Sequence, residues 1–327
     1  MNNALPIAKI KELNAPEMQH FEKFFKQSLK SNVPLLDSVM RYIIRRKGKQ
    51  MRPMLVFLSA KIAGEVTQST YTAAALIELL HTATLVHDDV VDDAAKRRGF
   101  FSVYALWKSK IAVLTGDFLL SKGLLLSVKH KEFDLLEIVS EAVKEMAEGE
   151  LLQIEKARRL NISEEDYLKV IHKKTASLIA ACTATGAKSA NADAHTIEKL
   201  KTFGKYAGIV FQIKDDLFDY QTNNLTGKPS GNDIKERKIT LPLIYALQKC
   251  SFSKKQKILH ILRFRRKNPK QIRKIISFVE ESGGIQYAEE KMNFYKDKAL
   301  TLLDDFPDNE AKFALQGLIE YIVERKK

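Results

Sequence analysis

The chain has 327 residues, of which 45% are hydrophobic and 29% charged, a balance that supplies a large core and argues against intrinsic disorder. No run of about 18 apolar residues occurs, and the first 40 residues hold neither an apolar signal core nor an arginine. We therefore expect no membrane-spanning helix, no targeting segment and a cytoplasmic location. The two cysteines, Cys182 and Cys250, cannot build a disulfide framework or a four-ligand zinc site, and we expect free buried thiols.

The net charge of +14 comes mostly from one segment. Between Ser251 and Val279 ten residues are basic and none is acidic, and without these ten charges the chain carries only +4. Interleaved apolar residues such as Ile258 and Leu262 are typical of an amphipathic helix with a solvated basic face. We expect no nucleic-acid partner, and weak association with an anionic membrane surface through Lys254–Lys274 is the alternative to a merely solvated face.

The predicted elements are helices throughout. All eight prolines lie at positions 6, 16, 34, 53, 229, 242, 269 and 307, so residues 54–228, rich in Ala, Leu, Lys and Glu, contain no helix breaker. Period-two alternation is nearly absent, which predicts no sheet. Breaks between helices are expected, in chain order, at Gly48–Pro53, Ala63–Thr67, Lys96–Phe100, Ala187–Ala194, Thr222–Asn232, Lys267–Pro269 and Pro307–Asn309. Because no tandem repeat or long linker is visible, the sequence predicts a single all-α domain over residues 1–327.

Two acidic clusters of the same form, Asp-Asp-x-x-Asp, each follow an apolar helical stretch. In a helix the first and last aspartates of such a cluster share one face, where like charges repel and oppose the helix dipole. One cluster would suit a solvated helix end, but two matched clusters predict a bound cation. Oxygen ligands without nearby His or Cys select Mg²⁺, which bridges readily to phosphate oxygens. The clusters are Asp88, Asp89 and Asp92, and Asp215, Asp216 and Asp219.

Basic side chains accompany the two clusters along the sequence. Lys49 and Arg52 stand at the start of a predicted helix, where free N–H groups also favour anions. His81 lies two turns before Asp88 on the same helix face. Each basic residue alone would be read as a solvent-exposed side chain without a specific role. Together they predict a site for a substrate with a diphosphate head and an apolar tail. The further members are Arg97 and Arg98, Lys173 and Lys174 with Thr175, and Lys228 and Lys238.

Several other chemistries lose support from the sequence. There is no P-loop and no G-x-G-x-x-G turn, which argues against nucleotide phosphoryl transfer and dinucleotide binding. A G-x-S-x-G nucleophile elbow is also missing.

With these motifs the sequence resembles the trans-type polyprenyl diphosphate synthases, in particular the long-chain octaprenyl and heptaprenyl types. The resemblance runs from about residue 35 to the end of the chain. One departure is Phe100-Phe101-Ser102, where many members carry a Pro-Thr pair. The motifs that carry the resemblance are Gly48–Pro53, His81 with Asp88-Asp89-x-x-Asp92, Arg97-Arg98-Gly99, Lys174-Thr175, Phe211-Gln212-Ile213-x-Asp215-Asp216-x-x-Asp219, Gly227-Lys228 and Gly231-x-Asp233-x-x-x-x-Lys238-x-Thr240-Leu241-Pro242.

The resemblance implies an all-α prenyl synthase fold, usually a homodimer, that condenses isopentenyl diphosphate with a geranyl, farnesyl or geranylgeranyl diphosphate. About three Mg²⁺ ions per active site are implied, held by all six aspartates of the two clusters. It implies that Arg97, Lys174 and Lys238 neutralise the leaving diphosphate, with Lys228 assisting. It assigns isopentenyl diphosphate to Lys49, Arg52, His81 and Arg98, and makes Thr175 and Gln212 orienting hydrogen-bonding groups.

Two rival functions remain beside this one. A class I terpene cyclase shares the first acidic motif and the helical fold, but its second metal motif normally carries Asn or Asp, Ser or Thr, and Glu. A non-catalytic subunit of a hetero-oligomeric synthase would be expected to have lost an acidic cluster, whereas both are present here.

Product length is predicted from the residues one turn before the first cluster. Ala83 and Thr84 occupy this level, and neither is large enough to stop a growing chain, so we expect products longer than about twenty carbons, in the range of quinone side chains. The alternative is that both residues are small only because two helices pack closely. Lower stops are expected among Leu120, Leu124, Leu126, Val139 and Met146.

Overall fold

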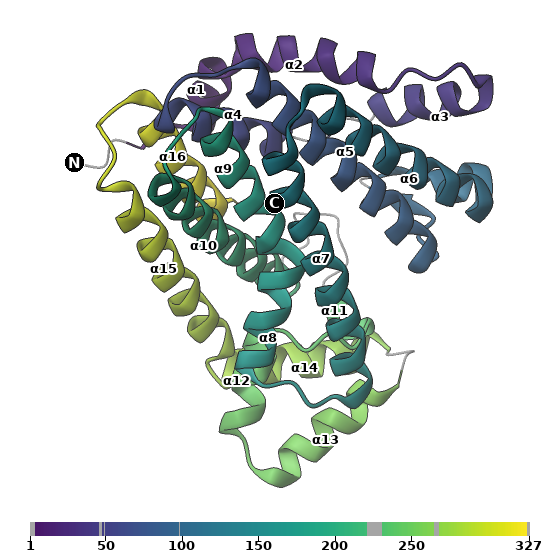
Figure 1. The fold of residues 1–327 in the computed structure, drawn as a ribbon. Coiled ribbons are helices and arrows are strands. Elements are labelled where there is room, and N and C mark those ends of the chain that lie inside the picture. Colours follow the sequence, from purple (N-terminus) through teal and green to yellow (C-terminus); the bar gives the residue numbers. More distant parts are fainter. Residues whose placement is uncertain are drawn as a thin grey trace. The chain divides into compact units, whose positions relative to one another are not determined.

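The computed structural model describes residues 4–45, 48, 50–97, 99–220, 231–264 and 268–325 (Figure 1). Nearly all regular structure in these residues is helical, which confirms the all-α prediction. The chain divides into two compact units, described separately below. Unit 1 comprises Met1–Val143, Ala181–Lys201 and Phe306–Leu315, and unit 2 comprises Lys144–Ala180, Thr202–Asp305 and Gln316–Lys327. A single domain over the whole chain stays a prediction.

The core of unit 1 is built around the pairing of its two longest helices, α5 and α6. The Cβ of any larger residue at Gly123 in α6 would lie 3.3 Å from both Leu76 and Leu80 of α5, so the glycine permits this close approach. The helices of this unit are α1 (Ile7–Leu13), α2 (Ala15–Ser28), α3 (Pro34–Arg45), α4 (Met51–Ala63), α5 (Gln68–Val91) and α6 (Val103–His130). Their shared core contains Leu29, Val39, Met40, Leu79, Ala83, Val86, Val103, Ala112 and Leu119.

Between α5 and α6 the structure departs from the expectation of no sheet. Strands β1 (Lys96–Arg97) and β2 (Phe100–Phe101) form an antiparallel pair with Arg97 opposite Phe100. Gly99 in the connecting turn has a φ of 82°, which glycine adopts without steric cost. Strands of two residues are too short to produce a period-two pattern, so they could not be predicted from the sequence.

Unit 2 is a second helical assembly with its own core. Gly284, at the start of α15, lies so close to α12 that a Cβ there would meet the carbonyl oxygen of Pro242 at 2.3 Å. Its helices are α8 (Glu164–Ile171), the π-helix η1 (His172–Ala176), α11 (Asn232–Lys235), α12 (Leu241–Lys249), α13 (Phe252–Arg263), α14 (Pro269–Glu281) and α15 (Gly284–Leu303). Four further helices contribute residues to both units: α7 (Phe133–Arg159), α9 (Ser177–Ser189), α10 (Ala194–Phe218) and α16 (Glu310–Glu324).

Most expected helix breaks lie where the structure has them, although most of the Thr222–Asn232 break falls outside the described residues. Several breaks were not expected, among them those between α2 and α3, between α12 and α13 and between α14 and α15. Two further unexpected breaks lie before and after α7. There Lys131 and Leu160 turn the chain with φ values of 58° and 52°. Because neither residue is Gly or Pro, the residue types that usually mark a helix end in a sequence were missing here. Ser163 with Asp166 forms a capping box before α8, a signal that could have revealed the second break.

Helix α6 carries an unusual amount of exposed apolar surface. By length and composition alone it could cross a membrane, although Asp117 and Lys122 interrupt its apolar run and a third of the most apolar stretch is buried. Its exposed apolar side chains are Leu106, Val113, Leu114, Leu124, Leu125 and Val128. Exposed apolar surface of this kind is typical of protein or membrane interaction sites.

Of the two free cysteines, only Cys182 is fully buried, and burial raises the pKa of its thiol to about 12. Cys250 is partly exposed, so the expectation of a buried thiol is wrong for that residue. Its place at the end of α12, outside the helix interior, explains the difference.

Candidate active site

The first acidic cluster lies at the C-terminal end of α5. Asp88 and Asp89 belong to its last turn, and Asp92 caps the helix, its backbone N–H donating to the carbonyl oxygen of Asp88 at 2.9 Å. Asp89 is buried, with 3% of its surface exposed, and burial raises the pKa of its carboxyl. Arg97 opposes this shift by donating from Nε to Asp89 Oδ1 at 2.6 Å. The structure therefore brings Arg97 to the first cluster, as the sequence predicted.

The short hairpin positions Arg97. Ser102, directly after β2, donates from Oγ to the carbonyl oxygen of Ala94 at 2.6 Å and accepts the N–H of Ala105 at the start of α6. Tyr42 of α3 donates its hydroxyl proton to the carbonyl oxygen of Phe101 at 2.6 Å. The unusual Phe-Phe-Ser sequence thus still forms an ordered turn. Arg98 lies outside the described residues.

Two predicted isopentenyl diphosphate ligands lie in α4 and α5. Arg52 belongs to the first turn of α4, and within the described residues its Nε is buried without a hydrogen-bond partner. A guanidinium N–H left in this state is suited to an anionic ligand. His81 is buried in α5 two turns before Asp88. Lys49 lies outside the described residues.

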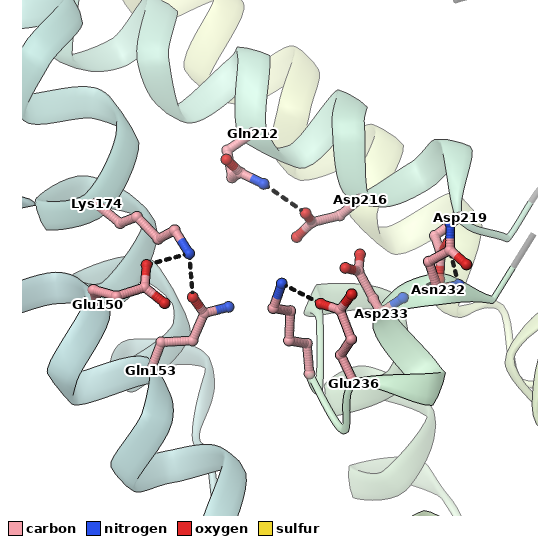
Figure 2. Close-up of polar contacts among 10 residues, drawn as sticks. Glu150, Gln153, Lys174, Gln212, Asp216, Asp219, Asn232, Asp233 and Glu236 are labelled. Atoms are coloured by element: carbon pink, nitrogen blue, oxygen red, sulfur yellow. Dashed lines mark hydrogen bonds and ion pairs between the residues drawn. The ribbon is translucent and has the colours of Figure 1, made fainter. Parts of the chain in front are cut away.

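In unit 2 the Lys-Thr motif lies in the π-helix η1, where an uninterrupted α-helix was expected. A π-turn widens the helix and changes the direction in which successive side chains point. Lys174 pairs with Glu150 and donates to Gln153 Oε1 at 2.7 Å, both on α7 (Figure 2). Thr175 instead donates to Gln212 Oε1 of α10 at 2.7 Å. Consecutive residues of η1 thus contact two different helices.

Two glycines let neighbouring helices approach η1 closely. A Cβ at Gly149 of α7 would lie 2.6 Å from the backbone nitrogen of Lys174. A Cβ at Gly208 of α10 would lie 2.5 Å from Cα of Ala176. Both distances are shorter than the 3.0 Å below which real Cβ atoms essentially never approach another atom. In both cases the neighbouring atom belongs to the backbone, so rotation of a side chain cannot relieve the clash. The position of η1 between α7 and α10 therefore depends on glycine at both sites.

Beside η1 lies a pocket of about 230 Å³ within unit 2. Figure 2 shows its charged groups: the ammonium of Lys174 and the carboxylates of Asp216 and Asp233 point into a shared space. Five of the predicted site residues line this pocket: Lys174, Thr175, Gln212, Asp216 and Lys238. Its further polar members, to which the sequence motifs assigned no role, are Gln153, Lys156, Tyr167, Asp233 and Thr240.

Asp216 is the most strongly constrained carboxylate of the pocket. Tyr167 donates its hydroxyl proton to Oδ2 at 2.7 Å, and Gln212 donates from Nε2 to Oδ1 at 2.8 Å. Burial, followed by the charge of Asp233, nevertheless raises the pKa of Asp216 to about 8. Tyr167 is hard to find from sequence, because it precedes Lys174 on a different turn and no motif marks it.

Asp233 and Lys238 form the opposite wall. Burial, with the charge of Asp219, raises the pKa of Asp233 to about 6. Burial lowers the pKa of Lys238, but its hydrogen bond to Glu236 at 2.6 Å and the nearby carboxylates outweigh this and raise it overall. Asp233 belongs to the Gly-x-Asp motif quoted above, and this position is the signal that could have revealed it.

The other two aspartates of the second cluster have different partners. Asp215 pairs with Arg325, the residue directly after α16, and the Arg325 guanidinium also stacks 4.3 Å from the ring centre of Phe211. Asp219 accepts the backbone N–H of Asn232 at 2.7 Å and of Asp233 at 3.0 Å, and thereby caps the short helix α11. Lys228 lies outside the described residues.

The donor set of the pocket fits a hard divalent cation. The negative charge of the half-buried Asp233 raises the pKa of the buried Asp216, and a cation bound beside them would relieve that repulsion. Among the described residues no group of three or more His, Cys, Asp and Glu is already arranged around one point. The aspartates are instead held by arginine, tyrosine, glutamine and backbone donors, as described above. Oxygen-only ligands of this kind suit Mg²⁺.

We predict that Gly208→Ala and Gly149→Ala each lower the free energy of unfolding by about 1–3 kcal/mol, because the added methyl must displace η1. Thermal or urea unfolding measures this directly. The matched control is Gly116→Ala in α6, where the three atoms nearest to the methyl all belong to the ring of His87, a partly exposed side chain that can rotate away. Equal destabilisation by all three substitutions would contradict the role given to the two glycines at η1.

Comparison with known proteins identifies the family of the chain. Residues 33–279 match the family model described as polyprenyl synthetase. The chain is 33% identical to the octaprenyl diphosphate synthase of Escherichia coli K12 over 98% of its length and 99% of the relative's. A crystal structure of a polyprenyl synthase from Caulobacter crescentus, complexed with calcium and isoprenyl diphosphate, is 32% identical with a TM-score of 0.90 and covers 100% of both chains. That of a geranylgeranyl pyrophosphate synthase from Bacteroides thetaiotaomicron is 39% identical with a TM-score of 0.83, covering 98% and 99%. The chain therefore belongs to the polyprenyl synthetase family and is a prenyltransferase.

Proposed function

We propose that this enzyme uses the pocket beside η1 to bind the diphosphate of an allylic substrate. The observation that carries the proposal is the meeting of three lysines with the buried Asp216 and the half-buried Asp233 in that pocket, with the Lys-Thr motif presented on a π-helix. Cations alone would suit any anion. Carboxylates buried among them fit an anion that arrives together with divalent metal. Isopentenyl diphosphate is the proposed second substrate.

The reaction begins with departure of diphosphate from the allylic carbon. When bound by the six aspartates of the two clusters, Mg²⁺ supplies Lewis-acid stabilisation of the leaving oxygens. Lys174, Lys238 and Arg97 add fixed positive charge, and Lys228 assists. Because Lys174 and Arg97 are already oriented by hydrogen bonds, little reorganisation opposes the step.

The second substrate then adds to the resulting carbocation. We assign the isopentenyl diphosphate to Lys49, Arg52, His81 and Arg98, supported by the buried, unpartnered Nε of Arg52. Its double bond attacks the allylic carbon, a carbon–carbon bond forms, and a proton is lost to the released diphosphate. Thr175 and Gln212, hydrogen-bonded to each other, orient the reacting groups. The product is a diphosphate longer by one isoprene unit.

The two rival functions predict different products from one assay. The purified chain is incubated alone with Mg²⁺, farnesyl diphosphate and labelled isopentenyl diphosphate. An elongated diphosphate supports the proposed reaction, a released hydrocarbon supports a terpene cyclase, and no turnover supports a subunit that needs a catalytic partner.

The exposed apolar face of α6 supports a homodimer, in which a second copy of the chain covers Leu114, Leu124 and Leu125. Sedimentation at the mass of a single chain would contradict it. Free cysteines suit the reducing cytoplasm, the location we propose, and cell fractionation tests it.

We predict that Asp88→Asn and Asp215→Asn lower turnover by about 10³-fold or more, because the leaving diphosphate loses metal ligands. Asparagine keeps the side-chain shape, so Arg325 retains an oxygen acceptor in the second variant. Steady-state incorporation of labelled isopentenyl diphosphate measures the effect, and excess chelator should reproduce it in the unmodified enzyme. Asp93→Asn is the control, because Asp93 lies next to the first cluster and instead accepts the hydroxyl of Tyr104. Near-normal rates in the first two variants would overturn the metal assignment.

We predict that Arg52→Ala raises the KM for isopentenyl diphosphate more than the KM for the allylic substrate, and that Arg97→Ala does the reverse. The reason is the separate placement of the two guanidinium groups, one at the start of α4 and one paired with Asp89. Initial-rate kinetics with each substrate varied in turn gives both constants. Equal shifts for both substrates would show that the division of the basic residues is wrong.

We predict that the enzyme makes products longer than about twenty carbons and that Ala83→Tyr shortens them, because a ring one turn before Asp88 blocks the growing chain. Ala83 is fully buried in the core of unit 1, whereas Thr84 is partly exposed, so Thr84→Tyr tests the same level with less strain. Leu35→Tyr, on exposed α3 surface, is the control. Chromatography of the dephosphorylated prenols decides the question. A fifteen-carbon wild-type product, or unchanged products in both tyrosine variants, would place the stop elsewhere.

A further inference from the structure

The basic segment found in the sequence folds into two helices of unit 2, α13 and α14. Both turn apolar side chains inward: Ile258 and Leu262 of α13 share the core of unit 2 with Ile272, Ile275 and Ile276 of α14. Most of the basic side chains therefore occupy the outward faces, whereas Lys254 reaches across to α14, its Nζ 5.0 Å from the ring centre of Phe278. We call the exposed members the basic ridge: Lys254, Lys257, Arg263, Lys270, Arg273 and Lys274.

The charge of the basic ridge is largely uncompensated within the chain. In the part of the chain that the structure describes, Lys254 pairs with Glu281 at 3.8 Å, and the other five members have no ion pair within 4.0 Å. The nearest acidic residues in sequence, Glu280 and Glu281, come only at the end of α14. Six cations on two adjoining helices thus create a positive surface that an anionic partner would neutralise.

Two aromatic side chains frame this surface. Phe252, at the first position of α13, is 76% exposed, and Phe264, directly after the helix, is 51% exposed. His260 packs its ring against Phe264 at a centroid distance of 5.2 Å. Exposed phenylalanine beside lysine and arginine is disfavoured on a merely solvated helix. It is characteristic of helices that lie in a bilayer interface, where the ring enters the acyl region and the cations meet headgroup phosphates.

We propose that α13 and α14 dock the protein on the surface of an anionic lipid bilayer through the basic ridge, with Phe252 and Phe264 inserted at its edges. Nucleic acid is the other anionic partner for such a surface, and the experiment below distinguishes it from lipid. The purpose of docking rests on the proposed function, since a prenyl chain of more than about twenty carbons partitions into a bilayer. The docking itself does not require activity.

Flotation of the full-length protein with vesicles tests the proposal without substrate. Vesicles of equal parts phosphatidylcholine and phosphatidylglycerol should carry the protein, and vesicles of phosphatidylcholine alone should not. Raising the salt from about 0.1 M to about 1 M shortens the Debye length from about 10 to about 3 Å and should release it. Neutralising Lys254, Lys257 and Arg263 together to Gln should weaken binding about a hundredfold, and F252A/F264A should weaken it about tenfold or more.

The matched control removes the same charge elsewhere. Lys9, Lys23 and Lys26 are exposed on α1 and α2 among acidic residues, and their replacement by Gln should leave flotation unchanged. Equal loss in both triple variants would show binding by net charge alone and overturn the docking site. No flotation of the unmodified protein, or preferential binding to a DNA or RNA duplex that competes with vesicles, would overturn the lipid assignment. Because isopentenyl incorporation is measured separately, failure of docking and failure of the proposed function are distinguishable.

Discussion

Carboxylates buried close together are the constraint on which the pocket of unit 2 depends. Asp216 and Asp233 would repel one another if both were ionised, and burial alone already favours their protonated forms. The structure offsets this cost by surrounding Asp216 with donors from Tyr167 and Gln212, and by placing Lys238 near Asp233. An arrangement that is costly in the free protein is useful when a cation and an anionic substrate arrive together, because both sets of charges are then neutralised.

The π-helix η1 extends this arrangement to the rest of unit 2. Lys174 contacts α7 and Thr175 contacts α10, so the two residues of one motif link two helices that both pack closely against η1. Gly149 and Gly208 make room for both contacts. A side chain at either glycine would push η1 away and alter the pocket without touching any charged group. The packing of η1 against its neighbours therefore affects the arrangement of charges in the pocket.

In unit 1 a buried carboxylate is also stabilised by a hydrogen-bond donor, but fewer residues take part. Asp89 is buried at the C-terminal end of α5, where the helix dipole also disfavours negative charge. Arg97 is held at hydrogen-bonding distance by a hairpin only a few residues later in the chain. The local sequence thus supplies both the charge and its partner. The fold does not have to bring them together from distant segments.

The sequence by itself determined the all-α fold, the family and the acidic and basic motifs. Long stretches without proline and the spacing of Asp-Asp-x-x-Asp are local properties that survive in any tertiary context. The α7 boundaries at Lys131 and Leu160 escaped prediction because non-glycine residues adopt the left-handed conformation there. Only the tertiary structure decided that Tyr167 and Asp233 join the pocket, that Asp219 caps α11 and that Asp215 pairs with Arg325, more than a hundred positions further along the chain. Those contacts join residues far apart in sequence, and their formation depends on how complete helices pack, which no local pattern encodes.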